Sequence, residues 1–165
     1  MISVKRAVAF CFCLLLLLTG CAQKTTAIES EGFSCRATVK WQGDTYALRM
    51  EAPGGGIFKA TVAQGNFKGM CFTLDADKVQ VSYLGMEYTL PEGFTGQNCV
   101  VAFKQVMQAL KRNGESAALD NKGRITLQTD MGNAEVTVRP DGFPEKIVLP
   151  EQQAEIALSE FNYLS

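Results

Sequence analysis

Hydrophobic and polar residues alternate in short segments along most of the chain, a pattern typical of strands that are buried on one side. The clearest segment is FSCRATVKW, residues 33–41, in which every second residue is apolar and the residues between are Ser, Arg, Thr and Lys. Gly43-Asp44 follows, and a glycine in first place favours a type II′ turn. The chain is therefore expected to reverse there into a second strand over residues 45–52.

The same alternation recurs roughly every ten residues, as in antiparallel sheets with short connections. Gly65-Asn66, Leu84-Gly85 and Gly132-Asn133 predict further turns, and Pro140-Asp141-Gly142 predicts another. The remaining predicted strands cover residues 57–63, 69–74, 78–83, 86–90, 123–129, 133–139, 145–149 and 154–164.

One segment, NCVVAFKQVMQALKRNG, breaks this two-residue period and predicts a helix of roughly four turns over residues 98–114. Asn98 or Thr95 can cap its start, and Gly114 suits its end. Its apolar residues recur at helical spacing, at Val100, Phe103, Met107 and Leu110.

About ten strands, each with a single apolar face, cannot stay flat without exposing that face. We predict a mainly β (α+β) fold, a strongly curved antiparallel sheet or half-open β-barrel with the helix covering its concave side. One helix is too small to fill this concavity, so an apolar groove for an acyl chain is one outcome and a solid core the other. Phe33, Val81 and Tyr88 should also point inward, and the predicted ligand-binding residues are Trp41, Tyr46, Leu48, Phe58, Phe72, Tyr83, Phe103 and Met107.

The N-terminus predicts a targeting signal. Lys5 and Arg6 precede an apolar run over residues 7–18, which is shorter than the roughly 20 residues of a membrane-spanning helix but typical of a signal peptide. The run ends in LLLLLTGC, which resembles the lipobox of bacterial lipoproteins. This resemblance implies a diacylglyceryl group on Cys21 and cleavage before it; the alternative is an uncleaved anchor helix.

These features divide the chain into a signal peptide (1–20), a lipidated flexible stalk (21–32) and one domain (33–165). Two acyl chains suffice for stable attachment to a bilayer, so we expect a lipid-anchored protein on the extracytoplasmic face of the cell membrane. Cleavage reduces the 16 basic residues to 14, against 17 acidic ones. With no basic block in the remaining 145 residues, nucleic acid is not an expected partner.

The order of elements, a meander followed by a helix and then by hairpins ending in DGFPEKIVLP and an alternating strand, resembles the LolA/LolB-like lipoprotein-carrier superfamily over residues 33–164. The resemblance implies a half-barrel with a hydrophobic concave face, which carries acyl chains in some members and serves protein contacts in others. It suggests two functions. One is binding of an apolar ligand, either a lipid or an acylated protein; the other is a non-enzymatic envelope scaffold that binds a partner protein.

Enzymatic chemistry is not expected. The chain has no histidine, which removes the usual base of Ser and Cys nucleophiles and the commonest metal ligand. Asp75 and Asp77 suit a solvated turn, and Gly54-Gly55-Gly56 lacks the motif of a phosphate-binding loop. We therefore predict no catalytic residue, no metal site and no cofactor.

Three cysteines remain in the domain, Cys35, Cys71 and Cys99. Their number allows at most one internal disulfide, and their spacing favours no pair over buried free thiols. Cys99 lies in the first turn of the predicted helix, where the helix dipole should lower its thiol pKa.

Overall fold

The computed structural model describes residues 32–76, 78–90, 98–113, 119–120, 122–140 and 142–164. The signal peptide, Cys21 and the stalk up to residue 31 lie outside the described residues, as do Thr95 and Gly114. Gly32, which was assigned to the stalk, is already part of the first strand. A Cβ at this position would lie 2.8 Å from the carbonyl oxygen of Ala52, so glycine suits this close approach of two strands.

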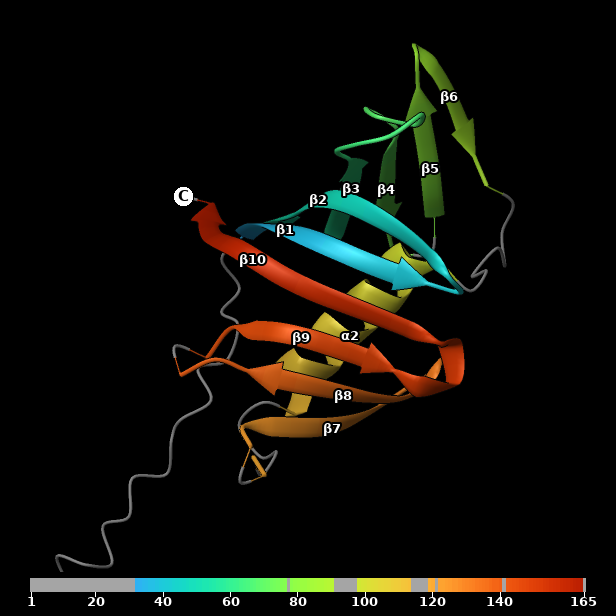
Figure 1. The fold of residues 1–165 in the computed structure, drawn as a ribbon. Helices are drawn as coiled ribbons and strands as arrows, with labels where there is room; N and C mark the ends of the chain where they lie inside the picture. Colours follow the sequence, from blue (N-terminus) through green and yellow to red (C-terminus); the bar gives the residue numbers. More distant parts are fainter. Residues whose placement is uncertain are drawn as a thin grey trace, which may run out of the picture.

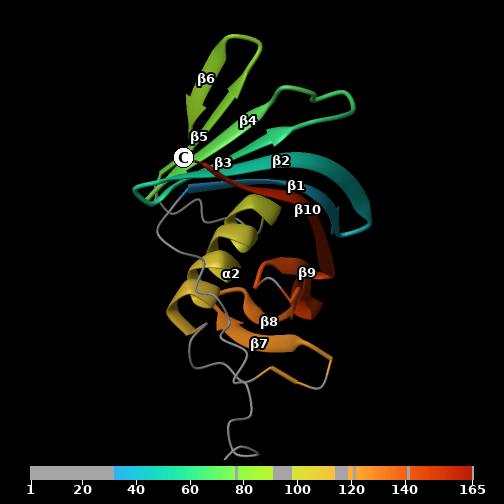
Figure 2. The ribbon, with the colours of Figure 1, turned by 90° about the vertical axis from the view of Figure 1, so that its left-hand side faces the viewer.

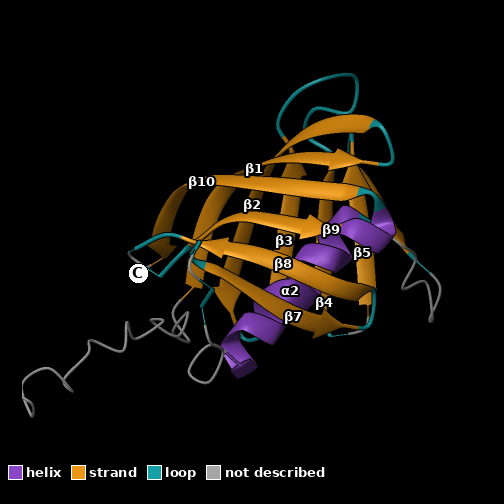
Figure 3. Ribbon diagram, turned by 60° about the horizontal axis from the view of Figure 1, so that its bottom comes forward, coloured by secondary structure: helices purple, strands orange, loops and turns teal. Residues whose placement is uncertain are grey.

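The predicted mainly β fold is confirmed. Ten strands form one antiparallel sheet in the order β6-β5-β4-β3-β2-β1-β10-β9-β8-β7 (Figures 1 and 3). In chain order, the elements are β1 (Gly32–Trp41), β2 (Asp44–Gly54), β3 (Ile57–Val62), β4 (Cys71–Asp75), β5 (Lys78–Tyr83), β6 (Met86–Thr89), α2 (Cys99–Asn113), β7 (Arg124–Thr129), β8 (Gly132–Val138), β9 (Pro144–Leu149), the 3₁₀ turn η1 (Pro150–Gln152) and β10 (Ala154–Leu164).

The sheet bends around α2. The last strand, β10, pairs with β1 and so joins the N-terminal meander to the C-terminal hairpins near the middle of the sheet. Figure 2 shows α2 inside the bend, with β1 and β10 on one side of it and β7 and β8 on the other, while β4, β5 and β6 project away from the helix. Within the described part of the chain, no helix is long and apolar enough to cross a bilayer.

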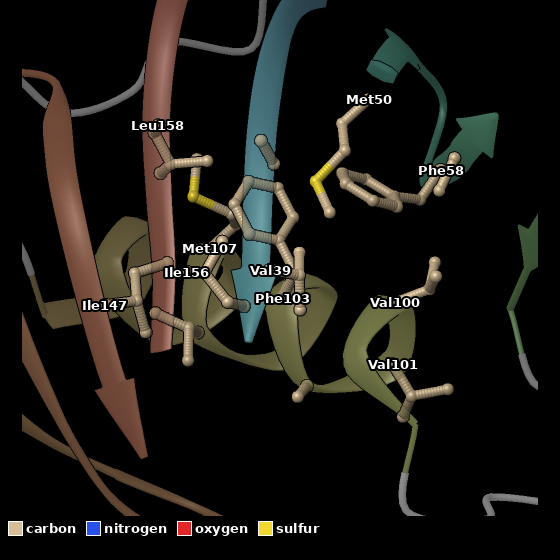
Figure 4. Close-up of a cluster of buried hydrophobic side chains, with 14 of the residues drawn as sticks. Val39, Met50, Phe58, Val100, Val101, Phe103, Met107, Ile147, Ile156 and Leu158 are labelled. Carbon is tan, nitrogen blue, oxygen red and sulfur yellow. The ribbon is translucent and has the colours of Figure 1, made fainter. Parts of the chain in front are cut away.

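The core lies between α2 and the concave face of the sheet (Figure 4). The Phe103 and Val106 side chains of α2 are fully buried, and the Phe103 ring lies 5.2 Å from that of Phe58 on β3. The strands meet them with residues of alternate positions, as the period of two predicts. The fully buried strand residues include Val39, Met50, Ile125, Ile147 and Ile156.

The helix begins at a side-chain cap. Asn98 Oδ1 accepts hydrogen bonds from the backbone N–H groups of Val100 and Val101, at 3.0 and 2.9 Å. Asn98 is therefore the N-cap, one of the two residues that the sequence allowed.

The alternation in β10 changes phase part-way along the strand. Ile156 and Leu158 point into the core, but the next inward residue is Phe161. Glu160 has a positive φ of 52°, and the β1–β10 register shifts beside it, which indicates a β-bulge. The bulge turns Phe161 inward, where its ring lies 5.5 Å from that of Phe33.

Two predicted turns are displaced. Asp44 already pairs with Trp41, so the first hairpin turns at Gln42 and Gly43. Both have positive φ (50° and 97°), as a type I′ turn requires, and not the predicted type II′. Gly132-Asn133 likewise belongs to β8, and the turn there precedes it.

Candidate functional site

An apolar pocket of about 510 Å³ opens beside the first turn of α2. Pockets that bind small molecules generally measure about 300–1,000 Å³ and have mostly apolar walls. We call this cavity the α2 pocket. Its apolar lining comprises Trp41, Tyr46, Leu48, Val62, Phe67, Met70, Phe72, Cys99 and Val100, and its polar lining comprises Thr45, Gln64, Asn66 and Asn98, with the backbone of Gly65.

The strand register brings this wall together. Tyr46 pairs with Val39, and Leu48 pairs with Val62, so both β2 side chains lie on the concave face. Trp41 closes β1 on the same face, since every second residue of that strand is buried. The helix supplies the opposite wall through Cys99 and Val100.

The eight predicted ligand-binding residues are divided by the structure. Trp41, Tyr46, Leu48 and Phe72 line the α2 pocket. The other four lie outside this lining. Phe58, Phe103 and Met107 belong to the solid core beneath α2, and Tyr83 lies behind the pocket's loop.

The sequence prediction missed one wall of the pocket. A two-residue turn at Gly65-Asn66 was predicted, but residues 63–70 form a longer loop before β4. Phe67 at its tip lines the pocket and is 58% exposed. The second glycine of QGNFKG, Gly69, has a positive φ of 88° and indicates where this loop returns to the sheet.

The loop is attached to the sheet by Tyr83 of β5. The Tyr83 hydroxyl donates a hydrogen bond of 2.9 Å to the carbonyl oxygen of Asn66. Its ring lies 6.3 Å from that of Phe67 in an edge-on arrangement. Tyr83 therefore supports the pocket wall from outside.

The concave side of β6, and of the part of β5 that pairs with it, is less covered than the rest of the sheet. Tyr88 pairs with Val81, and Met86 pairs with Tyr83, so all four share the concave face, as predicted for Tyr88 and Val81. However, Tyr88 and Met86 are 62% and 66% exposed. We call these two residues the β6 patch; it continues the apolar surface that begins at Phe67.

Burial decides the protonation of the thiol in the pocket. Burial raises the Cys99 pKa to about 11 and outweighs the backbone hydrogen bonds of the first helical turn, which lower it. The expectation of a lowered pKa from the helix dipole is therefore wrong. Cys35, deeper in the core, has its pKa raised by burial to about 12.

All three domain cysteines are free thiols, which answers the open question of a disulfide. Over the described ranges, no three side chains that could ligate a metal lie together.

The Tyr46 hydroxyl donates a 3.2 Å hydrogen bond to Asp44 Oδ2. Desolvation first, and then this carboxylate, raise the Tyr46 pKa, so the phenol beside the pocket is uncharged at neutral pH.

A second cavity, of about 390 Å³, lies along α2 and has a more polar lining that includes Lys104, Gln105 and Asp130. Lys104 Nζ donates a hydrogen bond of 2.8 Å to the carbonyl oxygen of Ala76. Because the wall of this second cavity is polar and charged, an apolar ligand would favour the α2 pocket.

No protein-family model and no curated protein matches the chain. Among solved structures, an uncharacterised conserved protein from Thermus thermophilus is similar, with a TM-score of 0.52 and 11% identity over 87% of this chain and 84% of the other. A LolA superfamily protein from Nitrosomonas europaea has a TM-score of 0.44 and 9% identity over 87% and 91%. A chain in the complex of the CwlD amidase with the GerS lipoprotein from Clostridioides difficile has a TM-score of 0.39 and 19% identity over 90% and 92%. The similarity to the Thermus protein is one of fold alone.

Proposed function

We propose that this protein is a cell-envelope lipoprotein that binds an apolar ligand, a lipid or an acylated protein, in the α2 pocket. The observation that supports this most strongly is the α2 pocket itself, an open cavity of about 510 Å³ whose wall is mainly aromatic and aliphatic. Burying a hydrocarbon chain there contributes about 0.8 kcal/mol for each CH₂ removed from water.

We further propose that Cys21 carries the lipid anchor that holds the domain at the extracytoplasmic face of the membrane. The stalk of residues 22–31 would reach at most about 35 Å. It joins the domain at Gly32, whereas the pocket lies at Trp41, the other end of β1. A ten-residue strand is about 30 Å long, so the pocket opens far from the point of attachment.

The test uses residues 22–165, which lack the acylation site. Trp41 is the single tryptophan and lines the pocket, so its fluorescence reports directly on occupancy. We expect an acyl amphiphile to change Trp41 emission saturably, and native mass spectrometry to find one ligand per domain. No saturable change and no bound mass would contradict the proposal.

A matched pair of variants locates the site. Phe67→Asp places a charge in the pocket wall and should weaken acyl binding at least tenfold, because the charge would lie against the chain. Leu84→Asp makes the same kind of change at a turn residue that is 81% exposed and does not line the pocket. It should leave the affinity within twofold; an equal loss in both variants would exclude the α2 pocket as the site.

The β6 patch favours a second candidate function, a scaffold that binds a partner protein. Among the described strands β6 is at one edge of the sheet, and its outer backbone could accept a strand of another chain. A photoreactive phenylalanine analogue at position 88 tests this in cells. A single crosslinked protein that persists in the Phe67→Asp background supports the scaffold, and its absence argues against it.

A further inference from the structure

The polar groups in the α2 pocket are all uncharged. Thr45, Gln64, Asn66 and Asn98 provide hydroxyl and amide groups, and none of the described residues that line the pocket is Lys, Arg, Asp or Glu. Binding pockets generally orient their ligands through a few such polar groups among apolar ones. In this pocket, those groups offer hydrogen bonds but no countercharge.

Most N–H groups at the start of α2 already have acceptors within the chain. Asn98 Oδ1 already accepts hydrogen bonds from the Val100 and Val101 N–H groups, at 3.0 and 2.9 Å. The Ala102 N–H donates to the Asn98 carbonyl oxygen at 3.0 Å. Three N–H donors of the helix start, which could otherwise hold a carboxylate or phosphate, are thus engaged within the chain.

Asp44 and Lys68 are neighbours of lining residues in the sequence, but neither lines the pocket. The Asp44 carboxylate accepts the hydrogen bond of the Tyr46 hydroxyl at 3.2 Å and places a negative charge beside the pocket. Lys68 lies in the loop of residues 63–70 but outside the pocket lining. An ionised head group inside the pocket would lose part of its hydration, and no residue of the lining would supply an ionic partner, which is unfavourable.

From the apolar wall and uncharged polar groups of the α2 pocket, we infer that it selects an amphiphile with an uncharged head group, such as a neutral acyl ester or amide. The chain would lie against Trp41 and Leu48, and the ester or amide would lie at the rim beside Gln64 and Asn66. This inference rests on the proposed function and specifies the chemistry of its ligand.

Three amphiphiles with chains of equal length test it: 1-lauroylglycerol, laurate and dodecyltrimethylammonium, each titrated below its micelle concentration against residues 22–165 with Trp41 fluorescence. We expect lauroylglycerol to bind at least tenfold more tightly than either ion. Equal affinities would overturn this inference, because the head group would then remain in water, and would leave the apolar pocket intact. Failure of all three to bind would overturn both.

A charge introduced at the rim sharpens the test. Gln64→Lys supplies a cation at an exposed lining residue and should raise the ratio of the affinity for laurate to that for lauroylglycerol about threefold. Gln80→Lys is the matched control, because Gln80 is exposed on β5 and pairs with Thr73 and Thr89 on the outer face. If Gln64→Lys does not shift the laurate preference relative to Gln80→Lys, the head group does not lie at this rim and the inference is wrong.

Discussion

The sheet has a part covered by α2 and an uncovered wing at β6, and the two carry the same alternation of apolar and polar residues. Under α2, Ile147 of β9 and Ile156 of β10 are fully buried, whereas Met86 and Tyr88 of β6 are mostly exposed on the same concave face. The period of two therefore shows which way a side chain points, and the extent of the helix decides whether it is buried.

Elementary dimensions explain the difference. α2 has 15 residues and is therefore about 22 Å long. Ten strands spaced about 4.8 Å apart span roughly 43 Å, about twice this length. A helix of this length cannot cover the whole of such a sheet. Every strand except β6 carries buried residues, and the α2 pocket lies beside the first turn of the helix, where its cover ends.

The largest expected effect is a difference in the free energy of unfolding between a substitution in the covered part and one in the wing. Phe103→Ala removes a fully buried ring and should lower the free energy of unfolding by about 3–5 kcal/mol. Met86→Ala in the wing should change it by less than about 0.5 kcal/mol, because this side chain is already in water. Urea unfolding followed by Trp41 fluorescence measures both. Comparable losses would mean that the wing is packed in solution and that the comparison fails.

Alkaline pH should destabilise the covered part of the protein through the thiols of Cys35 and Cys99. Burial raises the pKa of Cys35 from 9.0 to about 12 and that of Cys99 from 9.0 to about 11. The unfolded chain therefore releases these protons first, so the stability that the two thiols contribute is fully present well below pH 9 and is lost as the pH rises towards 11 and 12. By pH 10 the loss should be about 1 kcal/mol for each thiol.

Urea titrations at pH 8 and pH 10 measure this loss of stability. Cys99→Ala should remove the part of the loss that comes from the Cys99 thiol. A Cys99→Ala protein with the full pH dependence of the original would show that this thiol is not buried beside α2.

The smallest effect on stability is expected where α2 starts, at the boundary between the covered part and the wing. Asn98→Ala removes the acceptor for two backbone N–H groups and should cost about 1 kcal/mol. Asn98→Asp keeps an acceptor and serves as the control. Urea unfolding of the pair gives the difference, and equal stability of Asn98→Ala and the unchanged chain would contradict the capping role.

Much of the fold could be predicted from the sequence because each strand and the helix carry a strong periodic signal. The first predicted turn lies one residue too late and the one at Gly132-Asn133 two residues too late, because a glycine can occupy a turn position, as Gly43 does, or begin the strand after it, as Gly132 does. The β10 bulge was missed, although the inward series changes phase between Leu158 and Phe161.

The site could be predicted only in part. Trp41 and Leu48 were found because the concave face follows from alternation alone. Phe103 was assigned to the groove but lies in the solid core, since the sequence does not indicate how far across the sheet α2 runs. Phe67 was missed because loop residues carry no periodic signal.

The most direct test of the central claim is contact between a bound chain and the pocket wall. A lauroylglycerol that carries bromine on its chain quenches tryptophan only at short range, and Trp41 is the single tryptophan, so quenching places the chain in the α2 pocket. We predict saturable quenching at one ligand per domain, weakened at least tenfold by Phe67→Asp and unchanged by Leu84→Asp. Binding of the brominated lipid without quenching of Trp41 would contradict the account.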